Sequence, residues 1–124
     1  MQTLQQLRAK HALTKVKELV LLKEDAKLKA RASELPFMIH ANGLGQALAF
    51  FKSKKEKDGY DKLYLVLQSW LTQPQRPFAG KSDLMTAITE ADLNTYRVAQ
   101  AEAIVCMDWV KKFASAYLIR EESK

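Results

Sequence analysis

The stretch DLNTYRVAQAEAIVCMDWVKKFASAYLIR, Asp92 to Arg120, decides the fold class of this chain. Apolar side chains recur in it at intervals of three and four residues, which places them on one face of an α-helix. Asp92 is a residue type that caps helix N-termini well. The pattern predicts one long helix, from the Asp92 cap to about Arg120, that forms the spine of a helical core. The stripe consists of Leu93, Tyr96, Ala99, Ala103, Met107, Val110, Phe113, Ala114 and Tyr117.

A second, narrower apolar strip runs along the same predicted helix, outside the first face. It contains Val98, Val105 and Trp109. Two readings stay open. The strip meets a partner protein, or the helix is central enough to be covered on two sides by its own fold.

Helical periodicity also fills the N-terminal half of the chain. Thr3 followed by Gln6 is a capping-box pattern, and it predicts a helix from about residue 3 to residue 23. A second helical run follows, and we expect it to kink or break near Pro36, because proline lacks an N–H donor. Residues 42–43, Asn-Gly, are suited to end one helix and begin the next.

Further helices are predicted in the C-terminal half. Asp58 is the expected cap of a helix that stops at Pro74. The polar stretch TQPQRPFAGKSD, residues 72–83, predicts an exposed, mobile loop. A short helix over about 82–90 precedes the long one. The chain is therefore predicted to be all-α, one compact bundle of five to seven helices in a single domain over residues 1–124.

Composition limits the class of protein further. The 124 residues are 48% hydrophobic and 27% charged, an ordinary globular balance. The lone Cys106 lies in the apolar stretch AIVCMDWV, so we expect a buried thiol. No apolar run is long enough for a membrane span, and the first residues do not match a secretory signal. We expect a cytoplasmic protein with no membrane partner.

Positive charge is concentrated in the first half of the chain. Lys and Arg total 20 against 14 Asp and Glu, for a net charge of +6. Residues 1–57 carry a net charge of +7 and residues 58–124 a net charge of −1. This bias favours a polyanionic partner such as RNA, because bound phosphates release their counterions. The alternative is that the lysines only keep the helices soluble.

No residue pattern for catalysis is present in the sequence. His11 and His40 each lack a second histidine or an acid at the spacing that builds metal sites on helices. Gly43 and Gly45 form a Gly-x-Gly, but Leu48 replaces the third glycine of a dinucleotide fingerprint. We therefore predict no enzyme activity, no cofactor and no metal, and we read the two glycines as shaping a helix junction.

Three segments together resemble one protein family. They are QLRAKHALTKVKEL (Gln6–Leu19), PFMIHANGLGQALAFFKSK (Pro36–Lys54) and DLMTAITEADLNTYRVAQAEAIVCMDWVKKFASAYL (Asp83–Leu118). In this order they resemble the small subunit of the type III-B CRISPR effector complex, the Cmr complex, and the segment from Pro36 to Lys54 is the most specific of them.

The resemblance implies a function in antiviral defence. It implies a helical, non-catalytic subunit that stacks beside the backbone subunits of a ribonucleoprotein and helps hold the guide–target RNA duplex. Its expected partners are the backbone and large subunits, further copies of itself, guide RNA and target RNA. The competing hypothesis is a protein–protein adaptor that makes no direct RNA contact.

Candidate RNA-binding residues come from the basic half of the chain and from the resemblance. Phosphate contacts of this kind fix position without reading sequence. The preferred residues are Arg8, Lys15, Lys17, Lys52, Lys54 and Lys55, and the second choices are Arg97, Lys111 and Lys112.

Overall fold

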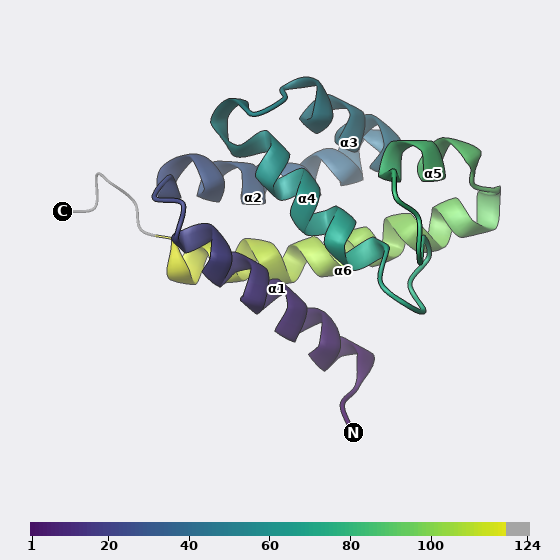
Figure 1. Ribbon diagram of the computed structural model, residues 1–124, viewed down its shortest axis with the longest axis horizontal. Coiled ribbons are helices and arrows are strands. Elements are labelled where there is room, and N and C mark those ends of the chain that lie inside the picture. The colour runs from purple at the N-terminus through teal and green to yellow at the C-terminus, as the bar shows by residue number, and fades with distance from the viewer. Residues whose placement is uncertain (119–124) are drawn as a thin grey trace.

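Helices account for most of the computed structural model, which describes residues 1–118 (Figure 1). Within these residues there is no strand, so the predicted all-α bundle of five to seven helices is confirmed. The elements are α1 (Leu4–Val20), α2 (Asp25–Asn42), α3 (Leu44–Ser53), the 3-10 turn η1 (Lys57–Gly59), α4 (Tyr60–Leu71), α5 (Leu84–Glu90) and α6 (Leu93–Tyr117).

Helix α6 is the spine of the bundle, as its apolar stripe predicts. Both α1 and α2 pack along it, and α4 also contacts it (Figure 1). Its middle residues Ala99, Ala103 and Met107 are fully buried. At the N-terminal end of the stripe Leu93 is 65% exposed, because the helix there extends past the core. The helix ends at Tyr117, and the predicted extension to Arg120 lies outside the described residues.

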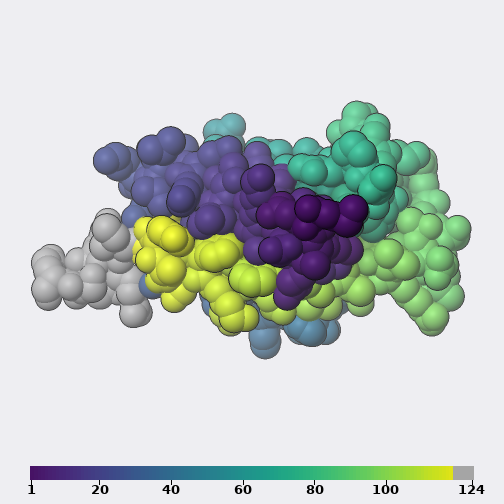
Figure 2. Space-filling model, turned by 90° about the horizontal axis from the view of Figure 1, so that it is seen from below, coloured from purple at the N-terminus to yellow at the C-terminus, as the bar shows by residue number. Residues whose placement is uncertain are grey.

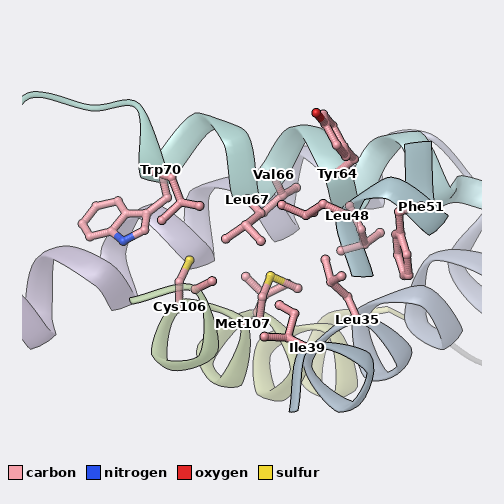
Figure 3. Packing of buried hydrophobic residues seen from close by; sticks show 14 of the residues in the cluster. Leu35, Ile39, Leu48, Phe51, Tyr64, Val66, Leu67, Trp70, Cys106 and Met107 are labelled. Atoms are coloured by element: carbon pink, nitrogen blue, oxygen red, sulfur yellow. The ribbon is translucent and has the colours of Figure 1, made fainter. Parts of the chain in front are cut away.

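The core lies between α2, α3, α4 and α6. Figure 3 shows side chains from these helices meeting in one cluster. Burying each large aliphatic or aromatic side chain stabilises the fold by about 1.5–3 kcal/mol before ordering costs are counted. The cluster includes Leu35, Ile39, Leu48, Phe51, Leu67, Cys106 and Met107, all fully buried.

The start of α1 follows its sequence signal closely. The Thr3 hydroxyl accepts a hydrogen bond from the Gln6 amide at 3.1 Å, and the Gln6 side chain accepts one from the Thr3 amide at 2.9 Å. The predicted capping box is therefore confirmed. The helix ends at Val20 rather than near residue 23, since Lys23 adopts a left-handed conformation with φ of 62°.

The predicted break at Pro36 does not occur. Helix α2 runs without a break from Asp25 to Asn42, with Pro36 buried inside it. Proline removes one backbone hydrogen bond from the helix. Its neighbours Leu35 and Ile39 are fully buried, so core packing on both sides of the proline outweighs the lost bond. The helix does end at the Asn-Gly junction, as predicted.

The predicted cap at Asp58 is also wrong. Asp58 lies inside η1 with φ of 53°, and Gly59, with φ of 82°, takes the cap position of α4 without a side-chain hydrogen bond. A Cβ at Gly59 would lie 2.8 Å from Leu28 Cδ2. The close packing of η1 on α2 therefore selects glycine, and the Asp58 carboxylate instead faces Lys27 Nζ at 3.6 Å.

The segment between α4 and α5 is anchored rather than fully exposed. Phe78 is only 2% exposed, and its amide donates to the Leu71 carbonyl at 3.0 Å. The Gly80 amide donates to the Thr72 carbonyl at 3.1 Å. The expectation of an exposed loop over residues 72–83 therefore fails at Phe78. Helix α5 then starts at Leu84, capped by the Asp83 side chain.

The second apolar strip of α6 is partly covered by the fold itself. Val98 is 51% exposed, whereas Val105 and Trp109 are half-buried. The Trp109 ring stacks on Phe113 with 5.5 Å between the ring centroids. Intramolecular packing thus accounts for the C-terminal part of the strip and leaves Val98 on the surface.

Candidate nucleic-acid interface

A cluster of lysines lies at the C-terminal end of α3. This helix buries Ala47, Leu48 and Phe51 on one side, so the lysines that follow Phe51 in sequence continue beyond the buried face. Lys52 and Lys55 are exposed, and positive charge at a helix C-terminus is favoured by the helix dipole. We call Lys52, Lys54 and Lys55 the α3 lysines.

Aromatic rings hold two of the α3 lysines in place. Lys52 Nζ lies 4.9 Å from the centroid of the Tyr64 ring, and Lys54 Nζ lies 4.9 Å from that of Phe50. Contacts of this kind attract a cation without neutralising it. Within the described residues none of the α3 lysines forms a salt bridge, so their charges remain available to a ligand.

A groove of about 630 Å³ lies beside the α3 lysines and is lined in part by Lys52, Lys55 and Tyr64. Acidic residues also line this groove. Asp83 is engaged by α5, because its carboxylate accepts hydrogen bonds from Thr86, and these bonds lower its pKa. Asp61 pairs with Lys62 at 3.4 Å, and Glu56 is exposed at the rim.

Arg8 is occupied by a buried partner. Its Nε donates to Glu102 Oε2 at 2.5 Å, and a terminal nitrogen donates to Oε1 at 2.9 Å. The Arg8 side chain is only 16% exposed. Trp70 Nε1 also donates to Glu102, at 2.7 Å. These contacts give Arg8 a structural role that the sequence alone did not indicate.

The remaining candidates lie on α1 and α6. Lys15 is half-buried and pairs with Glu18 at 3.5 Å, and Lys17 Nζ lies 5.8 Å from the centroid of the Tyr117 ring. Arg97, Lys111 and Lys112 are exposed on α6. Figures 1 and 2 show α1 and α3 on opposite sides of the bundle. The structure therefore divides the predicted residues into the α3 lysines and a separate α1/α6 group.

The buried Glu102 is the polar residue that sequence reasoning missed. It is 8% exposed and bridges α1, α4 and α6. Burial raises its pKa, but the hydrogen bonds from Arg8 and Trp70 outweigh burial, so its pKa is lowered. A signal was present in the sequence, because Glu102 is one acid between Ala99 and Cys106 on the apolar side of the long helix.

The Asn-Gly junction has the structural role predicted for it. Gly43 has φ of 90° and separates α2 from α3. The Leu44 amide donates to Gln100 Oε1 at 2.8 Å, and the Gly45 amide donates to the Tyr96 hydroxyl at 2.9 Å. A Cβ at Gly45 would lie 3.4 Å from that hydroxyl. The junction thus joins the start of α3 to α6.

Two of the three possible reactive groups, Cys106 and His11, are buried or engaged by other residues. Cys106 is buried as predicted, and burial raises the pKa of its thiol to about 12. His11 contacts Ser69 Oγ at 2.8 Å, but this hydroxyl donates to the Val66 carbonyl, so its proton is committed to the backbone. His40 is exposed.

Residues 1–118 contain neither a cluster of metal ligands nor a membrane-spanning helix. No group of three or more His, Cys, Asp or Glu side chains in this range is arranged to hold a metal ion. None of the helices in the described part of the chain is long and apolar enough to cross a membrane.

The fold and the exposed lysines define a small, basic, all-helical protein, and comparisons with known proteins identify its family. Residues 4–117 match the family model "CRISPR-associated protein (Cas_Cmr5)". The chain belongs to this family, the small subunit of the type III-B CRISPR Cmr complex.

One relative and one solved structure, both from Thermus thermophilus, agree with the family match. The chain is 30% identical over 118 residues to "CRISPR system Cmr subunit Cmr5", covering 95% of this chain and 98% of the relative. The crystal structure of a CRISPR-associated Cmr5 family protein superposes with a TM-score of 0.80 and 30% identity. That match covers 97% of this chain and all of the solved chain.

Proposed function

We propose that this Cmr subunit is non-catalytic and helps to hold the guide–target RNA duplex through the α3 lysines. The observation that carries the proposal is the local geometry. Lys52 and Lys54 are positioned on aromatic rings, and Lys55 is exposed beside them. Such groups contact phosphates and fix the position of a nucleic acid without reading its sequence.

The proposed partners follow from family membership. They are the backbone and large subunits of the Cmr complex, further copies of this chain, guide RNA and target RNA, in the cytoplasm. Lys15 and Lys17 on α1 and Arg97, Lys111 and Lys112 on α6 are further candidate contacts. Arg8 has a smaller part in the proposal, because Glu102 already engages its guanidinium.

The test is a paired substitution, Lys52→Gln with Lys55→Gln, in the assembled complex. Lys54 is left intact because its Nζ lies over two rings, those of Phe50 and Tyr60, whereas Lys52 lies over one. The slope of log affinity for RNA against log salt should decrease by about one for each lost phosphate contact. Lys23→Gln with Lys29→Gln removes the same charge elsewhere and is the control. Equal slopes for the two double variants would contradict the proposal.

A specific observation favours the second candidate, a protein–protein adaptor without direct RNA contact. Val98 on α6 and Leu65 on α4 are large apolar side chains, each about half exposed. An apolar interface responds much less to added salt than phosphate binding does. An adaptor would lose subunit assembly on Val98→Asp and Leu65→Asp, and it would retain the salt slope of RNA binding in the lysine variants.

A further inference from the structure

A second pocket, which we call the α1 pocket, lies on the side of the molecule opposite α3. It is formed by the first half of α1 and the segment after α4, which lie side by side in Figure 2 as purple and teal atoms. Its volume is about 330 Å³. The lining residues are Leu7, Lys10, His11, Thr14, Trp70, Gln73, Pro74, Gln75 and Arg76.

The charge of this pocket distinguishes it from three other grooves. Lys10 and Arg76 line it, and none of its lining residues is a carboxylate. Lysines line the other three grooves as well, but each of those grooves also has an acidic residue in its wall. The α1 pocket therefore presents positive charge that no acid in its own lining neutralises.

Arg76 is held firmly at the edge of the pocket. Its guanidinium carbon lies 5.2 Å from the centroid of the Trp70 ring, and Trp70 is itself fixed by its hydrogen bond to Glu102. The Arg76 amide donates to the Gln73 carbonyl at 3.0 Å, and the buried Phe78 anchors the same segment. Among the described residues the Arg76 guanidinium contacts the Trp70 ring, and its charge also helps to lower the pKa of the nearby Glu102 carboxylate. Its N–H groups can still donate to a ligand at the edge of the pocket.

Neutral polar groups form the wall between the two cations. Because Ser69 donates to the Val66 carbonyl, the contact between His11 Nε2 and Ser69 Oγ requires Nε2 to be the donor. His11 Nδ1 is then an acceptor for Gln73 Nε2 at 3.2 Å. His11 is therefore neutral here, and it orients Gln73.

The backbone at the mouth of the pocket is strained. Gln75 has φ of 68°, a left-handed conformation that is unfavourable for a residue with a side chain. Strain of this kind persists where the surrounding structure enforces it, and it is concentrated at functional sites. Here the residue that follows Gln75, Arg76, lies over Trp70.

We propose that the α1 pocket binds a phosphodiester group of RNA, with Lys10 and Arg76 supplying the charge. The proposal rests on the proposed function, in which the chain already contacts RNA. It adds a contact separate from the α3 lysines, so that one chain contacts RNA at two places on opposite sides of the bundle. Arg suits this role because its planar donors match phosphate oxygens in pairs.

The experiment uses the isolated full chain and amide NMR titration with a short RNA duplex. Shifts should occur at the residues that line the α1 pocket. The slope of log affinity against log salt should decrease by about two in Lys10→Gln with Arg76→Gln. The control Lys23→Gln with Lys29→Gln should leave the salt slope and the RNA-induced shifts at the α1 pocket unchanged. Lys10→Gln alone, which leaves the Trp70 contact intact, should decrease the slope by about one.

Two outcomes would overturn the proposal and leave the α3 lysines as the RNA contact. The first is an absence of RNA-induced shifts at the α1 pocket while the Lys52 and Lys55 variant still weakens RNA binding by the complex. The second is equal binding of a polyglutamate peptide of the same charge, which would assign the pocket to acidic protein segments. Failure of the α3 variant alone would count against the proposed function and not against this pocket.

Discussion

Glu102 joins three helices at the level of single atoms. Its carboxylate accepts two hydrogen bonds from Arg8 of α1 and one from Trp70 of α4. Removing a carboxylate from water is costly, and charged hydrogen bonds of good geometry offset that cost. The network fixes how α1 and α4 sit on α6, and it also holds Trp70 beneath Arg76.

Breaking this network from one side should be more damaging than removing it. Arg8→Leu leaves the buried Glu102 with the Trp70 hydrogen bond but without its ion-pair partner, and it should lower the free energy of unfolding by about 3 kcal/mol. The double variant Arg8→Leu with Glu102→Leu removes both charges and should recover much of that loss. Urea unfolding of the three proteins gives the comparison. A double variant less stable than Arg8→Leu would contradict a charge-pairing role.

Two residues predict how stability depends on pH. Burial lowers the pKa of His11 from 6.5, and the charge of Lys15 adds to this, so the unfolded chain binds the proton first. Stability from His11 is therefore lost as pH falls below about 6.5. The lowered pKa of Glu102 means that its contribution is lost at more acidic pH, as the carboxylate protonates in the fold.

The test is to measure the free energy of unfolding from pH 8 to pH 3, at intervals of about half a pH unit. His11→Gln should remove the upper part of the decline, and Glu102→Gln the lower part. A wild-type profile that rises as pH falls through 6.5 would show that the sign for His11 is wrong.

At the scale of single elements, the helix ends that depend on local signals were predicted correctly from the sequence. The capping box of α1, the Asp92 cap of α6 and the Asn-Gly junction depend on side chains within a few residues of each backbone group they satisfy. The errors arose where distant contacts decide. Packing around Pro36 keeps α2 continuous. Contact with Leu28 of α2 leaves no room for a side chain at position 59, so Gly59, and not the predicted Asp58, takes the cap position of α4.

The candidate site was predictable to a similar degree. Exposure of Lys52 and Lys55 follows from the position of Phe51 on the buried face of α3. The pairing of Arg8 with Glu102 spans 94 residues of sequence and needs the crossing of α1 over α6, which periodicity cannot supply. The pocket between Lys10 and Arg76 was missed for the same reason, because its two walls come from separate elements.

The segment between α4 and α5 makes a prediction of its own. Phe78→Ala removes a buried ring and should lower the free energy of unfolding by about 3–5 kcal/mol. The amides of Phe78 and Gly80 should also lose protection from hydrogen exchange, because the ring holds the segment against the core. Gln75→Gly places at this positive φ a residue that adopts it readily, and it should leave stability nearly unchanged. Equal effects of both substitutions would contradict an anchoring role for Phe78.

For the whole molecule, the structure offers basic surfaces and no assembled set of catalytic groups among the residues described. His11 is engaged by Ser69, and Cys106 is a buried thiol. The proposed non-catalytic role predicts that the purified protein leaves RNA, single-stranded DNA and nucleotides intact in an assay with and without divalent metal. Metal-dependent cleavage that co-purifies with the protein and disappears on one carboxylate substitution would overturn this.

The few phosphate contacts that one chain can make bind RNA weakly, so stable binding requires further copies or subunits. A few lysines on one small bundle give nonspecific binding with a Kd of roughly 1–100 μM at physiological salt. Several copies arranged along a complex would combine their contacts, because each later contact forms at a high effective concentration. The α3 lysines and the α1 pocket, which lie on opposite sides of the bundle, fit such an arrangement.

The most direct test of RNA holding is the titration of labelled guide–target duplex against three samples. These are the free protein, the Cmr complex assembled with it, and the complex assembled without it. The account predicts weak, sequence-indifferent binding by the free protein and a clear loss of affinity and salt slope when the complex lacks it. Equal affinity of the two complexes, or tight sequence-specific binding by the free protein, would contradict it.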